Sequence, residues 1–224
     1  MIDWNSVDTV LLDMDGTLLD LHFDNFFWME HIPAMYAQKH SISAEESAKQ
    51  LHSRFNSNQG TLDWYCLDHW SQQLDMDIPA LKKEMQHMIA LRPHVIEFLQ
   101  QLHTSTRDVV MVTNAHRKTL DIKMENIDLT GWFDRVVVSH ELAAAKEEQA
   151  FWHRLQALHP FDPARTLLID DTERVLDSAQ EYGIAHLLTL LQPDSSRQKR
   201  IDNRFPGIHH FDEIMPGVAP HERS

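Results

Sequence analysis

The sequence predicts an α/β fold: a parallel sheet flanked by helices, with an all-helical segment inserted after the first strand. Short aliphatic runs such as "TVLLD" (9–13) and "TLLID" (166–170) alternate with helical patterns in the second half of the chain. Strands buried on both faces have such continuous apolar runs, and their alternation with helices predicts parallel pairing through crossover helices. Residues 21–91, by contrast, contain several helical patterns but no convincing strand.

The predicted sheet contains strands that we place at 9–13, 109–113, 136–139, 166–170 and 186–191. Between the last four we expect helices at 119–127, 147–158 and 173–182, and Gly183 suits the end of the last helix. Another helix precedes the second strand. There the apolar residues follow the i, i+3, i+4, i+7 spacing of a buried helix face, at Val95, Phe98, Leu99 and Leu102.

The insert of about 70 residues is expected to form a separate helical domain. Its helical patterns lie at 25–39, 44–55, 62–74 and 79–89, separated by the polar stretches "SIS", "NSNQG" and "DMD". This organisation predicts a core domain made of residues 1–20 and 92–224, and a helical domain made of residues 21–91. The stretch after Gln192 is rich in Pro, Asp, Ser and Arg and is expected to be irregular.

The composition limits the partners of the chain. Its 34 acidic and 20 basic residues give a formal net charge of -14, which repels nucleic acid and anionic membrane surfaces. Cys66 is the single cysteine, so there is no intrachain disulfide and a reducing compartment is favoured. We see neither a signal segment nor an apolar run of about 18 residues. We therefore expect a cytoplasmic protein with no membrane or nucleic-acid partner, and the sequence indicates no oligomeric state.

Polar residues follow three of the predicted strands: Asp13 with Asp15, Thr113 with Asn114, and Asp170 with Asp171. Ligands bind outside the carboxyl ends of the strands in open parallel sheets, so these groups should converge on one edge. A carboxylate pair there can bind a metal, can act as a nucleophile beside an acid or base, or can cap a helix. The Gly16-Thr17 turn, the second carboxylate pair and a lysine within reach favour catalysis.

Phosphoryl transfer gives these groups a chemical reason to be together. Asp13 can attack phosphorus to form an aspartyl-phosphate, and Mg²⁺ can screen its repulsion from the anionic substrate. Mg²⁺ prefers oxygen ligands, which two carboxylates and a backbone carbonyl can supply. Asp15 can then protonate the leaving alkoxide and later accept a proton from water. Gly16 lets the loop turn its amide groups toward the phosphate.

The stretches "DMDGT", "VTN", "AAAKEEQAF" and "LIDD" resemble, in order and spacing, the four motifs of the haloacid dehalogenase-like hydrolase superfamily. The resemblance implies that superfamily's Rossmann-like sheet with a helical cap over the site. It also implies that Asp13 is the nucleophile and Asp15 the acid/base, with its backbone carbonyl on Mg²⁺. Many relatives have glycine or proline beside the motif lysine, and "LAAAKEE" has neither.

The remaining motifs of the superfamily imply the phosphate and metal contacts. Thr113 and the amide of Asn114 would hold phosphate oxygens, and Lys146 would neutralise the phosphate and orient Asp13. Asp171 would bind Mg²⁺ directly, whereas Asp170 would act through water.

Within the superfamily, "LLDMDGTLLDL", "WYCLD" and "TNAH" resemble the bacterial GMP/IMP-preferring 5'-nucleotidases. This resemblance implies a Mg²⁺-dependent phosphatase acting on a small phosphomonoester, a purine 5'-nucleotide first of all. Asp24 and Asn25 are candidates for selecting the base, and Phe27 is a candidate for stacking on it. Alternatively, Asp24 and Asn25 cap the first helix of the insert.

Other functions on the same fold remain open. A sugar-phosphate phosphatase or a phosphomutase would share all the core residues named above. A haloacid dehalogenase needs neither metal nor a proton for a leaving alkoxide, so Asp15 and the pair Asp170-Asp171 argue against it. A non-catalytic phosphometabolite sensor would have no need for the complete set of reactive groups.

Overall fold

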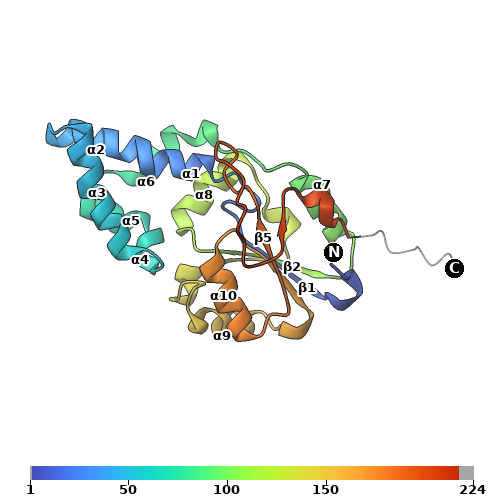
Figure 1. Ribbon diagram of the computed structural model, residues 1–224. Coiled ribbons are helices and arrows are strands. Elements are labelled where there is room, and N and C mark those ends of the chain that lie inside the picture. The colour runs from blue at the N-terminus through green and yellow to red at the C-terminus, as the bar shows by residue number, and fades with distance from the viewer. Residues whose placement is uncertain (1, 217–224) are drawn as a thin grey trace.

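The computed structural model, which describes residues 2–216, contains the predicted parallel sheet (Figure 1). The strand order is β3-β2-β1-β4-β5-β6, and every neighbouring pair is parallel. The strands are β1 (Thr9–Leu12), β2 (Asp108–Thr113), β3 (Arg135–Val138), β4 (Thr166–Ile169), β5 (His186–Leu190) and β6 (Gly207–Ile208). The predicted α/β fold is thus confirmed, and β6 is an addition from the stretch expected to be irregular.

The apolar strands are buried because helices cover both faces of the sheet. On one face, Val10 and Leu12 of β1 pack in a cluster with α7 (Val95–His103) and α8 (Arg117–Asn126). On the other face, Leu11 packs in a cluster with α9 (Gln149–Leu158) and α10 (Glu173–Tyr182). Burial of each such side chain contributes roughly 1.5–3 kcal/mol to the stability of the fold. Because successive side chains of β1 point to opposite faces of the sheet, this one short strand packs against both helical layers.

Residues 22–88 form helices that lie beside the sheet, at one end of the molecule (Figure 1). A hydrophobic cluster of their own, with Phe55, Trp70 and Leu74 among its buried members, holds them together. None of the helices in the part of the chain that the structure describes is long and apolar enough to cross a membrane. The helices of this insert are α1 (His22–Phe26), a π-helical turn (Phe27–His31), α2 (Ile32–His40), α3 (Ala44–Asn58), α4 (Leu62–Tyr65), α5 (Leu67–Leu74) and α6 (Ile78–Glu84).

The helix expected over 62–74 is interrupted, which corrects the sequence-based prediction. Cys66 has extended dihedral angles, φ -84° and ψ 112°, and so ends α4. Its Sγ accepts a hydrogen bond from the backbone N–H of His69 at 3.4 Å, which caps the start of α5. The break separates Tyr65 from the buried face of α5 and turns it toward the sheet.

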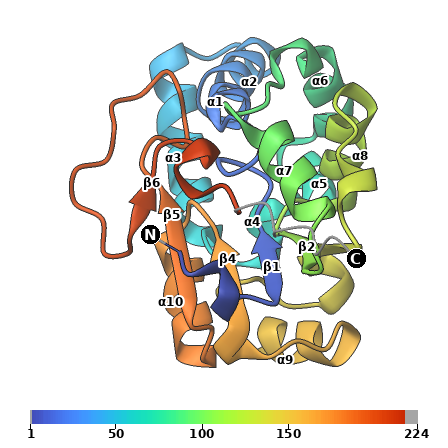
Figure 2. The same ribbon diagram turned by 90° about the vertical axis from the view of Figure 1, so that its right-hand side faces the viewer.

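The stretch after β5 packs against the connections between sheet and insert (Figure 2). The backbone N–H of Leu21 donates to Pro193 O at 2.9 Å, and Asn25 Nδ2 donates to Asp194 Oδ2 at 2.6 Å. In the returning connection, Arg92 Nη2 donates to His209 O at 2.9 Å. Both crossings into the insert are therefore fixed by a segment to which the sequence assigned no role.

Candidate active site

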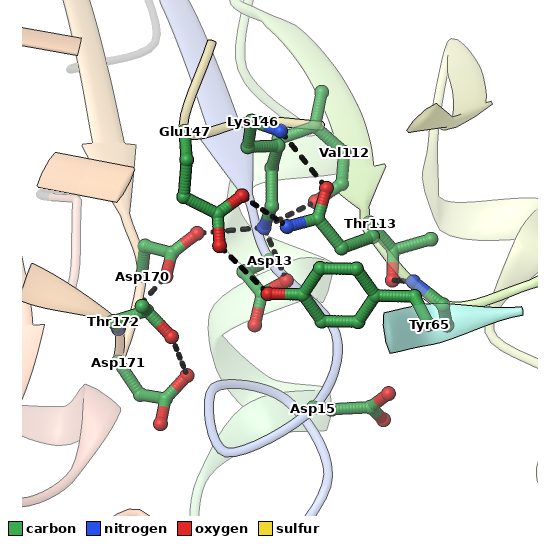
Figure 3. A network of polar contacts seen from close by, with 12 residues as sticks. Asp13, Asp15, Tyr65, Val112, Thr113, Lys146, Glu147, Asp170, Asp171 and Thr172 are labelled. Carbon is green, nitrogen blue, oxygen red and sulfur yellow. Dashed lines mark hydrogen bonds and ion pairs between the residues drawn. The ribbon is translucent and has the colours of Figure 1, made fainter. Parts of the chain in front are cut away.

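The predicted polar groups meet at the carboxyl edge of the sheet (Figure 3). Asp13 follows β1, Thr113 ends β2, and Asp170 follows β4. Because β1 lies between β2 and β4, the ends of these three strands are adjacent. The topology therefore brings together residues that are more than 150 positions apart in the sequence.

Lys146 lies at the centre of this edge. Its Nζ donates to Asp13 Oδ1 at 2.5 Å, to Asp170 Oδ2 at 2.7 Å and to Val112 O at 3.1 Å. The side chain is buried, which alone would lower its pKa, but Asp13 and Asp170 outweigh burial and raise it. Lys146 is therefore a permanent cation that bridges the ends of β1 and β4.

Side-chain hydrogen bonds hold the Lys146 loop, which has no glycine or proline beside the lysine. The backbone N–H of Lys146 donates to Asn114 Oδ1 at 3.0 Å, and that of Ala145 donates to Glu148 Oε1 at 2.9 Å. Ala143 adopts a left-handed conformation, φ 48°, where glycine is more usual. Asn114 thus fixes the lysine by contacts that the motif alone does not suggest.

Three buried carboxylates surround one side of Lys146. Asp13, Asp170 and Asp171 each offer an oxygen, and these oxygens lie within 4.8 Å of one another. Burial and the charge of Asp170 raise the pKa of Asp13 to about 6, although Lys146 opposes the shift. Burial, with the charges of Asp13 and Asp170, raises the pKa of Asp171 well above its usual value. Such an excess of buried negative charge, made of oxygen donors, fits a hard divalent cation.

The two carboxylates that follow β4 differ in how far the protein already uses them. Both oxygens of Asp170 accept hydrogen bonds, one from Lys146 and one from the backbone N–H of Thr172 at 2.9 Å. Asp171 has weaker contacts: Thr172 Oγ1 at 3.3 Å and Arg200 Nη2 at 3.6 Å. Asp171 is therefore the freer of the two to bind a metal ion.

Gly16 makes room for Asp171. The glycine has φ +79°, and a Cβ at this position would lie 2.7 Å from Asp171 Cγ. Any larger residue would therefore have to displace the carboxylate, besides adopting a strained backbone conformation. The glycine of "DMDGT" is required by this close approach.

Asp15 turns away from the three carboxylates. Its Oδ1 accepts from Lys123 Nζ, and Lys123 also contacts Asp24 Oδ2 at 2.5 Å. Burial, together with Asp24 and Asp13, raises the pKa of Asp15 to about 6 despite the opposing charge of Lys123. Lys123 was missed in the sequence, although a signal exists: it lies three residues after the buried Leu120 on an apolar face of α8.

Glu147 is a second residue that sequence reasoning missed. It accepts a hydrogen bond from Tyr65 Oη at 2.7 Å and another from Asn114 Nδ2 at 2.8 Å. Burial and the neighbouring Glu147 carboxylate raise the pKa of Tyr65 well above its usual value, which keeps the phenol protonated as a donor. Tyr65 belongs to α4, so this contact ties the insert to the Lys146 loop (Figure 3).

A pocket of about 270 Å³ extends from these groups to the insert. Thr113, Asn114 and Lys146 line its sheet side, and Thr113 Oγ1 already accepts from the backbone N–H of Ala115 at 3.0 Å. The insert contributes mainly aromatic and polar side chains, and α10 contributes a guanidinium: Trp28, Met29, Gln59, Trp64, Tyr65 and Arg174.

The three residues proposed for substrate selection have different positions. Asp24 and Asn25 line the pocket, but Asp24 is bound to two lysines and Asn25 to Asp194. Phe27 is not among the lining residues and is fully buried in the hydrophobic cluster of the insert. The prediction for Phe27 is corrected accordingly: its neighbour Trp28 faces the pocket.

Comparison with known proteins places this geometry in a family. The model described as haloacid dehalogenase-like hydrolase matches residues 10–189. The chain belongs to the haloacid dehalogenase-like hydrolases. A curated member of similar length is the GMP/IMP nucleotidase YrfG of Escherichia coli (strain K12). It is 38% identical over 217 residues, which cover 97% of this chain and 98% of that protein. This hydrolase is accordingly an enzyme that cleaves phosphoric monoesters.

Solved structures of other haloacid dehalogenase-like proteins share the fold. A phosphatase of this type from Thermococcus onnurineus superposes with a TM-score of 0.74 at 19% identity and covers 92% of this hydrolase and 95% of its own chain. The hydrolase YfnB of Bacillus subtilis, solved with bound magnesium, gives a TM-score of 0.62 at 17% identity over 92% of this chain and 96% of its own. At these identities the likeness concerns the fold alone.

Proposed function

We propose that this hydrolase is a Mg²⁺-dependent purine 5'-nucleotidase that prefers GMP and IMP and works through an aspartyl-phosphate. The arrangement of Lys146, bound to both Asp13 and Asp170 beside the freer Asp171, carries the proposal for the reaction. The preference for GMP and IMP is supported by the 38% identity to a nucleotidase of that name, because the similarity spans the insert as well as the sheet.

The residues divide the chemistry between two steps. In the first, an oxygen of Asp13 attacks phosphorus, the ester P–O bond breaks, and protonated Asp15 donates its proton to the departing alkoxide. In the second, Asp15 accepts a proton from a water that attacks the aspartyl-phosphate, which releases inorganic phosphate and restores Asp13. A pKa near 6 suits Asp15 for both roles close to neutral pH.

Charge neutralisation is the second requirement. Lys146 offsets the negative charge of the phosphoryl group, while Thr113 and the amide of Asn114 are the proposed phosphate donors. Asp13, Asp171 and the backbone carbonyl of Asp15 would hold Mg²⁺, with Asp170 acting through water. When bound, the ion would supply positive charge at the nucleophile and the phosphate.

We also propose that residues 21–91 form a cap domain that selects the base. Trp28 and Trp64 offer faces for stacking, since both line the pocket on the insert side. Arg174 of α10 lines the same pocket and lies close to Gly60 of the insert, since its Nη1 is 3.7 Å from where a Cβ of residue 60 would be. Within residues 2–216, no ion pair engages this guanidinium. It can donate two hydrogen bonds to O6 and N7 of a 6-oxopurine, whereas adenine presents an amino donor instead of O6.

The test is a comparison of kcat/KM for GMP, IMP, AMP, UMP and glucose 6-phosphate, with Mg²⁺ and with EDTA. We expect GMP and IMP to exceed AMP by about 10-fold or more, and Arg174→Met to reduce that ratio, since a bidentate contact discriminates by about 1–3 kcal/mol. A preference for the sugar phosphate would overturn the nucleotidase assignment. Undiminished turnover in EDTA would overturn the metal dependence.

A further inference from the structure

A chain of four charged side chains, of which the two lysines are buried and the two carboxylates are partly exposed, links Asp15 to the insert. Lys123 Nζ donates to Asp15 Oδ1 and to Asp24 Oδ2, the latter at 2.5 Å, and Lys82 Nζ donates to Asp24 Oδ1 at 2.7 Å. The four residues come from the loop after β1, from α1, from α6 and from α8. We name this series Asp15–Lys123–Asp24–Lys82 the ion chain.

The two lysines of the ion chain are buried among aromatic rings. Their side chains are 1% exposed for Lys123 and 2% for Lys82. Lys82 Nζ lies 4.8 Å from the ring centroid of Phe27, and Lys123 Nζ lies 5.4 Å from that of Phe23. Removing an ammonium group from water costs several kcal/mol, and apolar residues of similar volume often stabilise a protein at least as well as a buried ion pair. A contribution to stability therefore does not by itself explain why charged lysines occupy these two buried positions.

Asp15 lines the pocket, whereas Lys123 does not. Lys123 can therefore affect a substrate only through the two carboxylates that it holds, Asp15 and Asp24, which both line the pocket. By binding Oδ1 of Asp15, it fixes the rotation of the carboxylate and leaves Oδ2 for the leaving group. Asp24 accepts from the same ammonium group, Lys82 in turn donates to Asp24, and both of these residues belong to the insert.

We propose that Lys123 is a positioning residue for Asp15, and that Asp24 and Lys82 make its position depend on the docking of the insert. This role rests on the proposed function, in which Asp15 protonates the leaving group. The acid is then aligned only when α1 and α6 are seated against α8, so cleavage is coupled to closure of the insert over the substrate.

The leaving group provides a readout that a merely structural role would not move. An alkoxide needs a proton from Asp15, whereas p-nitrophenolate is a stable anion that departs without one. We therefore compare kcat/KM for GMP with kcat/KM for p-nitrophenyl phosphate, because both values report the steps up to release of the leaving group. A loss of alignment lowers the first value selectively, and a damaged fold lowers both.

Lys123→Met should lower kcat/KM for GMP about 100-fold, and that for p-nitrophenyl phosphate by less than about 10-fold. Lys123→Arg, which keeps the charge, should recover part of the loss. Lys82→Met should show the same selectivity with a smaller loss, because Lys82, which also lines the pocket, reaches Lys123 only through Asp24, and it provides the test if Lys123→Met does not fold.

Lys83→Met is the matched control. Lys83 is next to Lys82 in α6 and joins that helix to α8 through an exposed ion pair with Glu125 at 2.7 Å. The Lys83→Met substitution should leave both kcat/KM values unchanged. Equal losses on both substrates in the Lys123 and Lys82 variants, or no loss, would overturn the positioning role while leaving the phosphatase intact. If the wild type prefers another alkyl phosphomonoester, that ester replaces GMP, so failure of the substrate assignment is recognised separately.

Discussion

Two charge clusters include a carboxylate from the loop after β1, and they differ in the balance between carboxylates and lysines. The first, which we name the carboxylate cluster, combines Asp13, Asp170 and Asp171 with Lys146. The second is the ion chain, with two carboxylates and two lysines. With every group ionised, the carboxylate cluster therefore carries a net charge of -2, whereas the ion chain is neutral.

The pKa values show what this difference does. In the carboxylate cluster, burial and two neighbouring carboxylates raise the pKa of Asp171 well above its usual value. In the ion chain, burial would also raise the pKa of Asp24, but Lys123 and Lys82 lower it to about 2, whereas Asp15, which within residues 2–216 contacts one lysine only, has its pKa raised by burial to about 6. The excess of carboxylates in the carboxylate cluster thus fits a bound cation, whereas in the ion chain the number of lysines equals the number of carboxylates.

The largest expected effect is that of Asp13→Asn. The amide is nearly isosteric but a poor nucleophile, so kcat should fall by roughly 10³-fold or more, as for loss of other catalytic nucleophiles. Steady-state assays with the best phosphomonoester measure it, and circular dichroism checks that the variant is folded. Retention of more than a few per cent of the activity would contradict a covalent role for Asp13.

The second prediction concerns the two aspartates that follow β4. Asp171→Ala should raise the Mg²⁺ concentration for half-maximal activity by about 10–100-fold, and by more than Asp170→Ala does. The reason is that Asp171 has few protein contacts and can bind the ion directly, whereas both oxygens of Asp170 already accept hydrogen bonds. Metal titrations of both variants give the order. A larger shift for Asp170→Ala would reverse the assignment of the direct ligand.

The third prediction tests the ion chain through pH. The folded pKa of Asp24, about 2, lies below the unfolded value of 3.8, so its ionic contacts stabilise the protein above pH 3.8 and are lost as the pH falls toward 2. Asp24→Asn should therefore lower the free energy of unfolding by on the order of 1–3 kcal/mol at neutral pH. Urea titrations should show that this difference shrinks below pH 3.8, and a constant difference would contradict it.

Much of the carboxylate cluster could be predicted from the sequence because its members occupy the ends of strands. A parallel sheet places the carboxyl ends of all its strands on one edge, so the convergence of Asp13 and Asp170, with Thr113 on the same edge, can be predicted without knowledge of side-chain contacts. The strands themselves were evident as apolar runs. The short β6 was not, because a pair of residues carries no periodicity.

The ion chain could not be predicted in this way. Lys123 and Asp24 are 99 residues apart on two helices, and sequence periodicity does not tell which helix faces pack together. In the aromatic run Phe26-Phe27-Trp28 it is similarly difficult to predict which ring faces the pocket. Three consecutive helical residues point in directions about 100° apart, so together they face most sides of the helix. A π-helical turn begins at Phe27 and further alters the phase, so the ring that faces the pocket was misassigned.

The most direct comparison of the two clusters is a measurement of thermal unfolding near pH 8 for wild type, Asp171→Asn and Asp24→Asn. Each protein is measured once with EDTA and once with excess Mg²⁺. The account predicts that in EDTA Asp171→Asn raises the Tm by about 2–4 °C, because it removes repulsion worth about 1 kcal/mol, whereas Asp24→Asn lowers it. Mg²⁺ should then raise the Tm of wild type and of Asp24→Asn more than that of Asp171→Asn. An equal Mg²⁺-dependent rise in Asp171→Asn, or a loss of stability there like that of Asp24→Asn, would contradict the account.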